Sequence, residues 1–226
     1  MGYKDYRTAK MGSEVSVFYP VDMDEYMKAI RAGKNTMWLR HGDHTLLGLA
    51  KASIPYGRED HPSLFWFRYF RRIRMDTATD AEISKDFMTD KTSMEVEHVN
   101  KNQLVPVIFS HGLSANRTLH SGTCRDLASF GYIVFAPDHM DLTCSYFEGQ
   151  DGKGTYYCNK RDSHDLQFRQ SQLDQRVKEV RALIDEISQP SFLQKMGFPE
   201  DVSLNLDQLI VSGHSFGGMT AIDTSV

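Results

Sequence analysis

The chain has 226 residues and a formal net charge of −4 at pH 7. Its length allows a sizeable core, and no change in composition separates two domains, so a single domain over residues 1–226 is expected. The basic residues are scattered, which argues against a nucleic-acid partner, and no apolar run is long enough to span a bilayer.

The three cysteines, Cys124, Cys144 and Cys158, form an odd set without the spacing of a metal site. Residues 1–5 lack the apolar core of a signal peptide. We therefore expect free thiols, no metal and no cofactor in a cytoplasmic protein. Nothing in the sequence indicates an oligomeric state.

The N-terminal part alternates short candidate elements. Polar and apolar residues alternate in Glu14–Tyr19, which predicts a strand with one buried face. A second short strand is predicted at Thr36–Leu39. The segment His44–Ser53 is predicted to be a helix that ends before Pro55.

The stretch Leu64–Arg74 combines aromatic residues with arginines. Wound as a helix, it places its rings on one broad side and Arg68, Arg71 and Arg72 on the other. Such a helix can lie in a membrane interface with its arginines toward anionic lipid. It can also pack its rings on the body of the protein, and both interpretations stay open. Residues 75–103 are polar and are expected to be rich in loops.

Two almost entirely apolar runs, Leu104–Phe109 and Tyr132–Ala136, are typical of strands covered on both faces of a parallel sheet. Pro106 is unusual in the first of them, because an interior strand needs its N–H groups. A helix is predicted between the two runs, ending at Phe130 with Gly131 as its stop. This order of strand, helix and strand predicts an α/β fold.

A turn is predicted within Tyr146–Tyr157, around Asp151-Gly152. Apolar residues then recur at helical spacing from Asp165 to Ile187, which predicts one long amphipathic helix that stops before Pro190. We expect the charged face of this helix to be solvated.

The stretch Leu209–Gly218 carries the strongest chemical signal. An apolar run ends at Ser212, and the pattern Gly213-x-Ser215-x-Gly217 follows directly, with a further glycine at Gly218. This is the context of a nucleophile elbow, in which the serine sits on a strained turn from strand to helix. Glycines two residues away remove side chains that would collide with the strand or helix.

Acyl transfer through serine needs a nucleophile, a base and donors for the oxyanion. Ser215 is the candidate nucleophile, and the backbone N–H groups of Leu113 and Phe216 are the candidate donors. A glycine-rich surface turn and an ordinary strand-ending loop are the alternatives for these two segments. His139 is more consistent with fixing its loop than with acting as the base.

The base and its orienting acid normally follow the serine in the chain. No histidine follows Ser215 here, and Asp223 lies on the helix that the elbow begins. We therefore expect an incomplete α/β-hydrolase fold, a mostly parallel sheet with helices on both faces that lacks its last strands. The elbow strand would otherwise form an open apolar edge.

Several motifs together resemble the platelet-activating-factor acetylhydrolase family of α/β-hydrolases, and the resemblance runs from Glu14 to the end of the chain. They are Phe109-Ser110-His111-Gly112-Leu113, Arg117-Thr118-Leu119, Asp126-Leu127-Ala128-Ser129, Gly131-Tyr132-Ile133-Val134, Asp138-His139, the spacing Gln172-x-x-x-Arg176-x-x-Glu179, and Gly213-His214-Ser215-Phe216-Gly217-Gly218. Met140 departs from the pattern, since the family often has Arg there.

The resemblance implies a calcium-independent serine esterase that removes acetyl, short or oxidised sn-2 acyl chains from phospholipids such as platelet-activating factor. It implies the nucleophile role for Ser215 and the oxyanion role for Leu113 and Phe216. The family's catalytic Asp and His have no counterpart in this chain. Peripheral membrane contact through Leu64–Arg74 would suit a lipid substrate.

Two alternatives remain at this point. The chain could belong to an α/β-hydrolase that acts on soluble esters, or it could be an inactive fragment that lacks the catalytic Asp and His.

Overall fold

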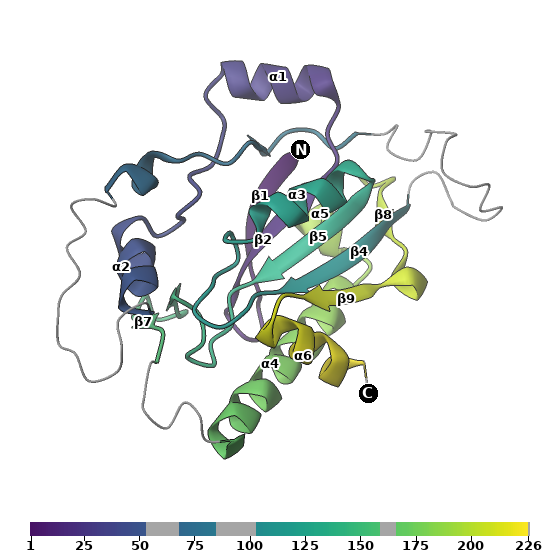
Figure 1. Ribbon diagram of the computed structural model, residues 1–226. Helices are drawn as coiled ribbons and strands as arrows, with labels where there is room; N and C mark the ends of the chain where they lie inside the picture. The colour runs from purple at the N-terminus through teal and green to yellow at the C-terminus, as the bar shows by residue number, and fades with distance from the viewer. Residues whose placement is uncertain (53–67, 85–102, 159–165, 226) are drawn as a thin grey trace.

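The computed structural model describes residues 1–52, 68–84, 103–158 and 166–225. A seven-stranded sheet in the order β3-β1-β2-β5-β4-β8 forms its centre, and β9 also pairs with β4 (Figure 1). The strands are β1 (Gly2–Arg7), β2 (Glu14–Tyr19), β3 (Ala78–Thr79), β4 (Gln103–Ser110), β5 (Tyr132–Pro137), β8 (Ser203–Leu204) and β9 (Ile210–Gly213), with the separate hairpin β6 (Tyr146–Glu148) and β7 (Gly154–Tyr156). The helices are α1 (Met23–Arg31), α2 (Asp43–Ala52), α3 (Ser121–Ser129), α4 (Leu166–Ile187), α5 (Phe192–Lys195) and α6 (Phe216–Thr224), with 3-10 turns η1 (Arg68–Arg72) and η3 (Leu206–Gln208).

The sheet is mixed and mostly parallel. The strands β5, β8 and β9 all run parallel to β4, and β3 runs parallel to β1, whereas β2 is antiparallel to both β1 and β5. Pro106 lies where β4 has passed β8 and has not yet reached β9, since β8 pairs at Gln103–Leu104 and β9 at Val107–Ser110. This gap explains how a proline without an N–H fits an interior strand.

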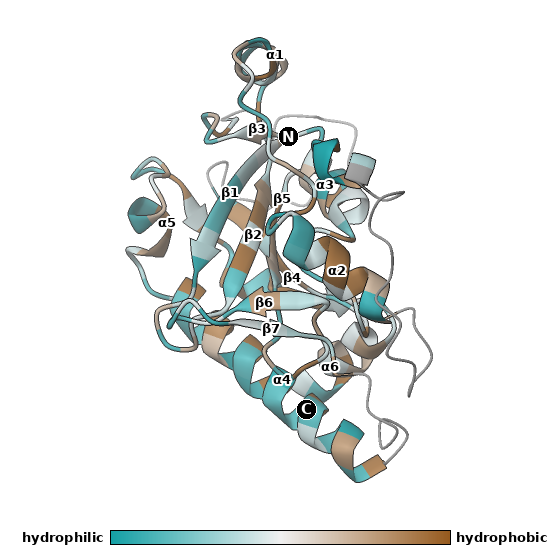
Figure 2. Ribbon diagram, turned by 90° about the vertical axis from the view of Figure 1, so that its left-hand side faces the viewer, coloured by the Kyte–Doolittle hydropathy of each residue, from teal (hydrophilic) through white to brown (hydrophobic). Residues whose placement is uncertain are grey.

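Alternate residues of the central strands supply two cores on opposite faces of the sheet. Ile108, Ile133 and Phe135 pack on one face with α4 and α5, while Val107 and Val134 pack on the other with α3. Figure 2 shows the hydrophobic colour on β2 at the centre of the sheet and hydrophilic colour along much of α4. The prediction of a mostly parallel sheet with helices on both faces is therefore confirmed.

The predicted strands at β2, β4 and β5 are confirmed, as are the helices α2, α3 and α4 and the turn between β6 and β7. The prediction of a strand at Thr36–Leu39 is wrong. Met37 forms only an isolated antiparallel bridge with Arg74, flanked by the hydrogen bonds from Trp38 N–H to the Ile73 carbonyl and from Met75 N–H to the Thr36 carbonyl. Strand β1 and helix α1 have no counterpart among the predictions.

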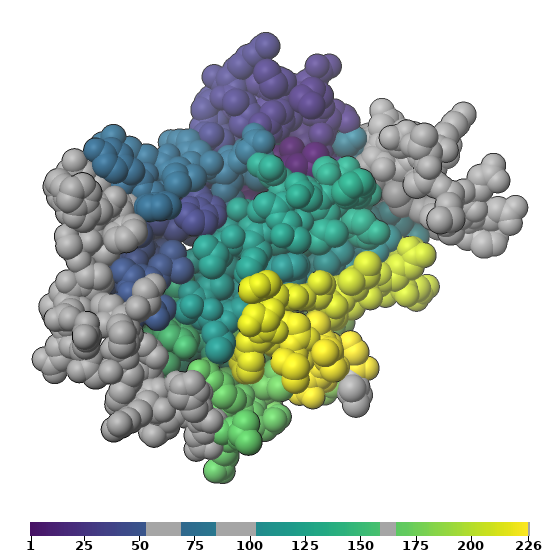
Figure 3. All heavy atoms as spheres, viewed as in Figure 1, coloured from purple at the N-terminus to yellow at the C-terminus, as the bar shows by residue number. Residues whose placement is uncertain are grey.

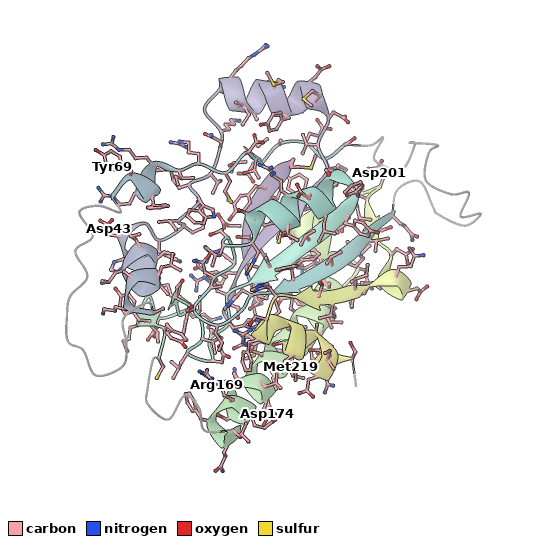
Figure 4. The ribbon with its side chains drawn as sticks, viewed as in Figure 1. Asp43, Tyr69, Arg169, Asp174, Asp201 and Met219 are labelled. Carbon is pink, nitrogen blue, oxygen red and sulfur yellow. The ribbon has the colours of Figure 1, made fainter. Side chains whose placement is uncertain are left out.

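Part of the Leu64–Arg74 segment falls outside the described residues. Within its described part, residues 68–74, Arg68–Arg72 form the 3-10 turn η1 in place of an α-helix. Tyr69 is 62% exposed, and Phe70 and Ile73 are also exposed, so these three side chains do not pack into the core. Figure 4 labels Tyr69 at the rim of the molecule, away from the central sheet.

Strand β9 and helix α6 lie at the surface on one side of the sheet (Figure 3). Among the described strands, β4 is the one that pairs with β9. Ile210, Met219 and Ile222 from this region are 40%, 51% and 65% exposed. That further strands cover this edge stays a prediction.

Glu14 at the start of β2 joins several segments. Its carboxylate accepts from Arg117 at 2.8 Å and from Arg7 at 2.9 Å, and it contacts His41 Nε2 at 2.5 Å. Burial raises the pKa of Glu14, but the bond to His41 and the charges of Arg117, His41 and Arg7 outweigh it and lower the pKa to about 2. The carboxylate is therefore stabilised in its charged form.

We expect Glu14→Gln to lower the free energy of unfolding by roughly 1 to 3 kcal/mol at pH 7. Because the folded-state pKa is lowered, the stabilisation is complete above the ordinary value of 4.5 and is lost as the pH falls toward 2. Urea unfolding of both proteins across this range tests the expectation, with Glu25→Gln on the exposed face of α1 as the control. An equal difference at pH 7 and pH 2 would contradict it.

Candidate active site

Ser215 occupies the junction between β9 and α6. Its backbone has φ 55° and ψ −118°, an unfavourable conformation for a residue with a side chain. The residue is exposed, and the N–H of Gly218 donates to its carbonyl at 2.9 Å. The predicted sequence of strand, sharp turn and helix is thus present, with the serine at the strained position.

Two of the three elbow glycines are required by close backbone contacts. A Cβ at Gly213 would lie 2.4 Å from the carbonyl oxygen of Gly217. A Cβ at Gly217 would lie 2.0 Å from the carbonyl oxygen of Ser110 at the end of β4. At Gly218 the nearest atom would be 3.7 Å away, which is an ordinary contact. Gly213 and Gly217 therefore let α6 pack against the end of β4, whereas Gly218 is not needed for this.

The loop after β4 lies directly against the elbow. The N–H of His214 donates to the carbonyl of Ser110 at 3.1 Å. A Cβ at Gly112 would come within 3.3 Å of the Ser215 Cβ, so glycine permits this approach. Within the described part of the chain, neither the N–H of Leu113 nor that of Phe216 has a hydrogen-bond acceptor. The fold thus brings together the two segments that carry the candidate oxyanion donors.

A buried polar chain supports this loop from the side of α4. Ser110 Oγ lies 2.7 Å from His139 Nε2, and His139 Nδ1 lies 2.7 Å from Glu179 Oε2. Burial lowers the pKa of His139 to about 3 and raises that of Glu179 to about 7. The imidazole is therefore neutral, and its two ring nitrogens link the Ser110 hydroxyl and the Glu179 carboxyl in one buried hydrogen-bonded chain.

The expectation that the charged face of α4 is solvated holds for Asp174, Lys178, Arg181 and Asp185, which are exposed, but not for the two charged residues beside this polar chain. Arg176 and Glu179 are 0% and 4% exposed, and Gln172 is also buried. The spacing of four and three residues between them places all three on one side of the helix, next to the apolar stripe. This spacing could have indicated that the three residues share a partly buried side of the helix, although their polar character suggested exposure.

No described histidine ring hydrogen-bonds to Ser215. His139 is completely buried within the hydrogen-bonded chain of Ser110, His139 and Glu179, which agrees with a structural role for this residue. His111 is also buried, with Nδ1 donating to the Gly112 carbonyl at 2.7 Å, and burial lowers its pKa well below the ordinary value. The rings of His120 and His214 lie 4.7 Å apart, beside the elbow.

His111, Asp138 and Cys144 place possible ligand atoms within 4.8 Å of one another. Each of these groups already has a partner. Asp138 accepts from the Arg117 N–H at 2.6 Å and pairs with its guanidinium, His111 Nε2 accepts from the His139 N–H at 3.2 Å, and Cys144 Sγ lies 3.4 Å from Asp138. The arrangement is that of a satisfied polar cluster, and the three cysteines are free thiols.

The fold is that of α/β-hydrolase-type esterases. A ferulic acid esterase from Streptomyces cinnamoneus superposes with a TM-score of 0.60 at 16% sequence identity, covering 99% of this chain and 54% of the esterase. The chain belongs to the family described as platelet-activating factor acetylhydrolase, isoform II, whose sequence model matches residues 3–226.

Curated relatives agree with this membership. The platelet-activating factor acetylhydrolase of Bos taurus is 35% identical over 147 residues, covering 56% of this chain and 33% of the relative. That of Canis lupus familiaris is 33% identical over 135 residues, covering 51% of this chain and 30% of the relative. A putative phospholipase A2 of Schizosaccharomyces pombe is 29% identical over 158 residues, covering 56% of this chain and 36% of the relative. The match thus spans about a third of the length of these relatives.

Proposed function

We propose that Ser215 is the nucleophile of a calcium-independent serine esterase that cleaves acetyl, short or oxidised sn-2 acyl esters of phospholipids. The observation that carries the proposal is the positive φ of Ser215 at the turn between β9 and α6. Strain of this kind persists where the surrounding structure holds it, and it is concentrated at functional sites. The names of the curated relatives support the substrate class.

In this mechanism the Ser215 hydroxyl attacks the ester carbonyl and forms a tetrahedral intermediate. The N–H groups of Leu113 and Phe216 would receive its oxyanion, and the positive end of the α6 dipole would add to the stabilisation. Collapse of the intermediate releases the lysophospholipid and leaves an acyl-serine, which water then hydrolyses. Gly213 and Gly217 shape the turn that makes this attack possible.

The proton of Ser215 needs a base, and none of the described histidines hydrogen-bonds to it. We propose that the base and its acid come from outside residues 1–226, so that this chain alone is inactive. The chain would then be part of one α/β-hydrolase domain. For activity measurements we define the extended protein as residues 1–226 followed by the C-terminal region of the bovine relative.

Lipid as the substrate is supported by the exposed apolar and aromatic side chains around η1. Tyr69, Phe70 and Ile73 are exposed next to Arg71, a combination suited to peripheral contact with a membrane surface. No helix within the described residues is long and apolar enough to cross a membrane.

We expect the extended protein to hydrolyse an acetylated phospholipid in vesicles, with no loss of rate when EDTA removes calcium. Tyr69→Ser should lower this rate about tenfold, because a ring at the interface is lost, while leaving hydrolysis of p-nitrophenyl acetate unchanged. Phe130→Ser is the matched control, since Phe130 is 80% exposed at the end of α3. Cleavage of the soluble ester without cleavage of vesicle lipid would refute the lipid assignment.

A further inference from the structure

Arg176 on α4 is the largest fully buried side chain among the described residues. Its Nε donates to Asp141 Oδ2 at 2.9 Å, and its Nη2 donates to the hydroxyl of Thr143. Both partners lie in the loop after β5. These contacts neutralise the buried charge and fix the plane of the guanidinium.

The same guanidinium also reaches the candidate active site. Its Nη1 donates to the carbonyl of His111 at 2.6 Å and lies 3.4 Å from Ser110 Oγ. Its central carbon lies 4.8 Å from the centre of the Phe216 ring, within the range of a cation–π contact. One side chain therefore contacts both the loop that leads to Leu113 and the first residue of α6.

We propose that Arg176 is a positioning residue that fixes the backbone N–H groups of Leu113 and Phe216 relative to each other. The inference rests on the proposed function, because that function makes these groups the oxyanion donors. The two donors come from segments far apart in the sequence, so local structure cannot hold their separation. Donors that are already in place need no reorganisation when charge develops on the substrate.

Arginine suits this position because its rigid planar fork forms hydrogen bonds in the plane while its face stacks on a ring. A lysine would keep the charge and could still pair with Asp141. Its single ammonium could not also hold the His111 carbonyl and cover the Phe216 ring. Arg176→Lys therefore separates the buried charge from the geometry of the fork.

The test compares amide ¹H–¹⁵N spectra of the 226-residue chain in four forms: unchanged, Arg176→Lys, Phe216→Leu and the double variant. Phe216→Leu is expected to shift the amide signals from His111 to Leu113 because the guanidinium transmits the change. This shift should fall at least about threefold in the Arg176→Lys background, as expected for coupled sites. Arg181→Lys is the control on the same helix, where the side chain contacts the Thr224 carbonyl.

Two results would overturn the proposal: an undiminished shift in the Arg176→Lys background, or no shift of the loop amides in Phe216→Leu. If Arg176→Lys does not fold, Thr143→Val replaces it in the cycle, since it removes the acceptor of Nη2 with little change in volume. An undiminished shift in the Thr143→Val background, or no shift of the loop amides in Phe216→Leu, would then overturn the proposal.

Turnover separates this inference from the proposed function. In the extended protein, Arg176→Lys should lower kcat on the order of 10-fold to 100-fold and change KM less than about twofold, since oxyanion binding is realised in the transition state. A normal kcat in this variant would refute the positioning role alone. An unaltered extended protein that is folded and hydrolyses no ester would refute the proposed function, whatever the spectra show.

Discussion

Gly217→Ala is expected to destabilise the fold by about 3 kcal/mol or more, at the upper end of what overpacking costs. The new Cβ would lie 2.0 Å from the Ser110 carbonyl oxygen and 2.9 Å from that of His111. Both contacts are with backbone, so neither can be relieved by rotating a side chain, and α6 must move away from β4. Urea unfolding of the 226-residue chain, followed by circular dichroism, measures the effect.

Gly218→Ala is the matched control for this prediction. It lies one residue further along α6, and its Cβ would have its nearest neighbour at 3.7 Å. We expect it to be neutral or to stabilise the helix by up to about 1 kcal/mol, because alanine has the higher helix propensity. Equal destabilisation by the two variants would show that α6 does not pack against β4 as described.

Ser215→Ala is expected to lower kcat of the extended protein by roughly 10⁴-fold or more, because no other group replaces the nucleophile. Stability should change little, since the side chain is exposed. Steady-state hydrolysis of p-nitrophenyl acetate gives the measurement. Ser212→Ala, in the neighbouring strand β9, is the control and should keep its activity. Substantial turnover by Ser215→Ala would assign the chemistry to another residue.

The sequence predicted most of what local patterns determine. The apolar runs of β4 and β5 identified interior strands, and helical periodicity identified α4. The elbow was also predictable, because its steric demands fall on residues only two positions from the serine. Leu113 could be paired with Phe216 only through the known architecture of such elbows, since the loop and α6 are distant in the sequence.

The polar chain behind the elbow was not predictable from the sequence pattern. A charged residue on an amphipathic helix is normally solvated, and burial of Arg176 and Glu179 depends on partners contributed by other elements. Asp141 and His139 lie after β5, and Ser110 ends β4. Periodicity along α4 does not identify these partners, because they approach the helix only in the folded chain.

The N-terminal region shows a second limit. Strand β1 reads as a polar segment, yet it pairs with β2 over six residues and with β3 over two. Its strand character depends on this pairing rather than on its own composition. Thr36–Leu39 shows the opposite case. Its residues have a suitable strand propensity, but the segment forms a single bridge, from Met37 to Arg74, and therefore no extended strand.

Fluorophosphonate labelling followed by peptide mapping tests most directly whether Ser215 is an activated serine. We predict a single label on Ser215 in the extended protein, none in its Ser215→Ala variant, and none in the 226-residue chain, because we propose that the base comes from outside it. A label on a different serine of the folded extended protein, or no label at all, would contradict the account.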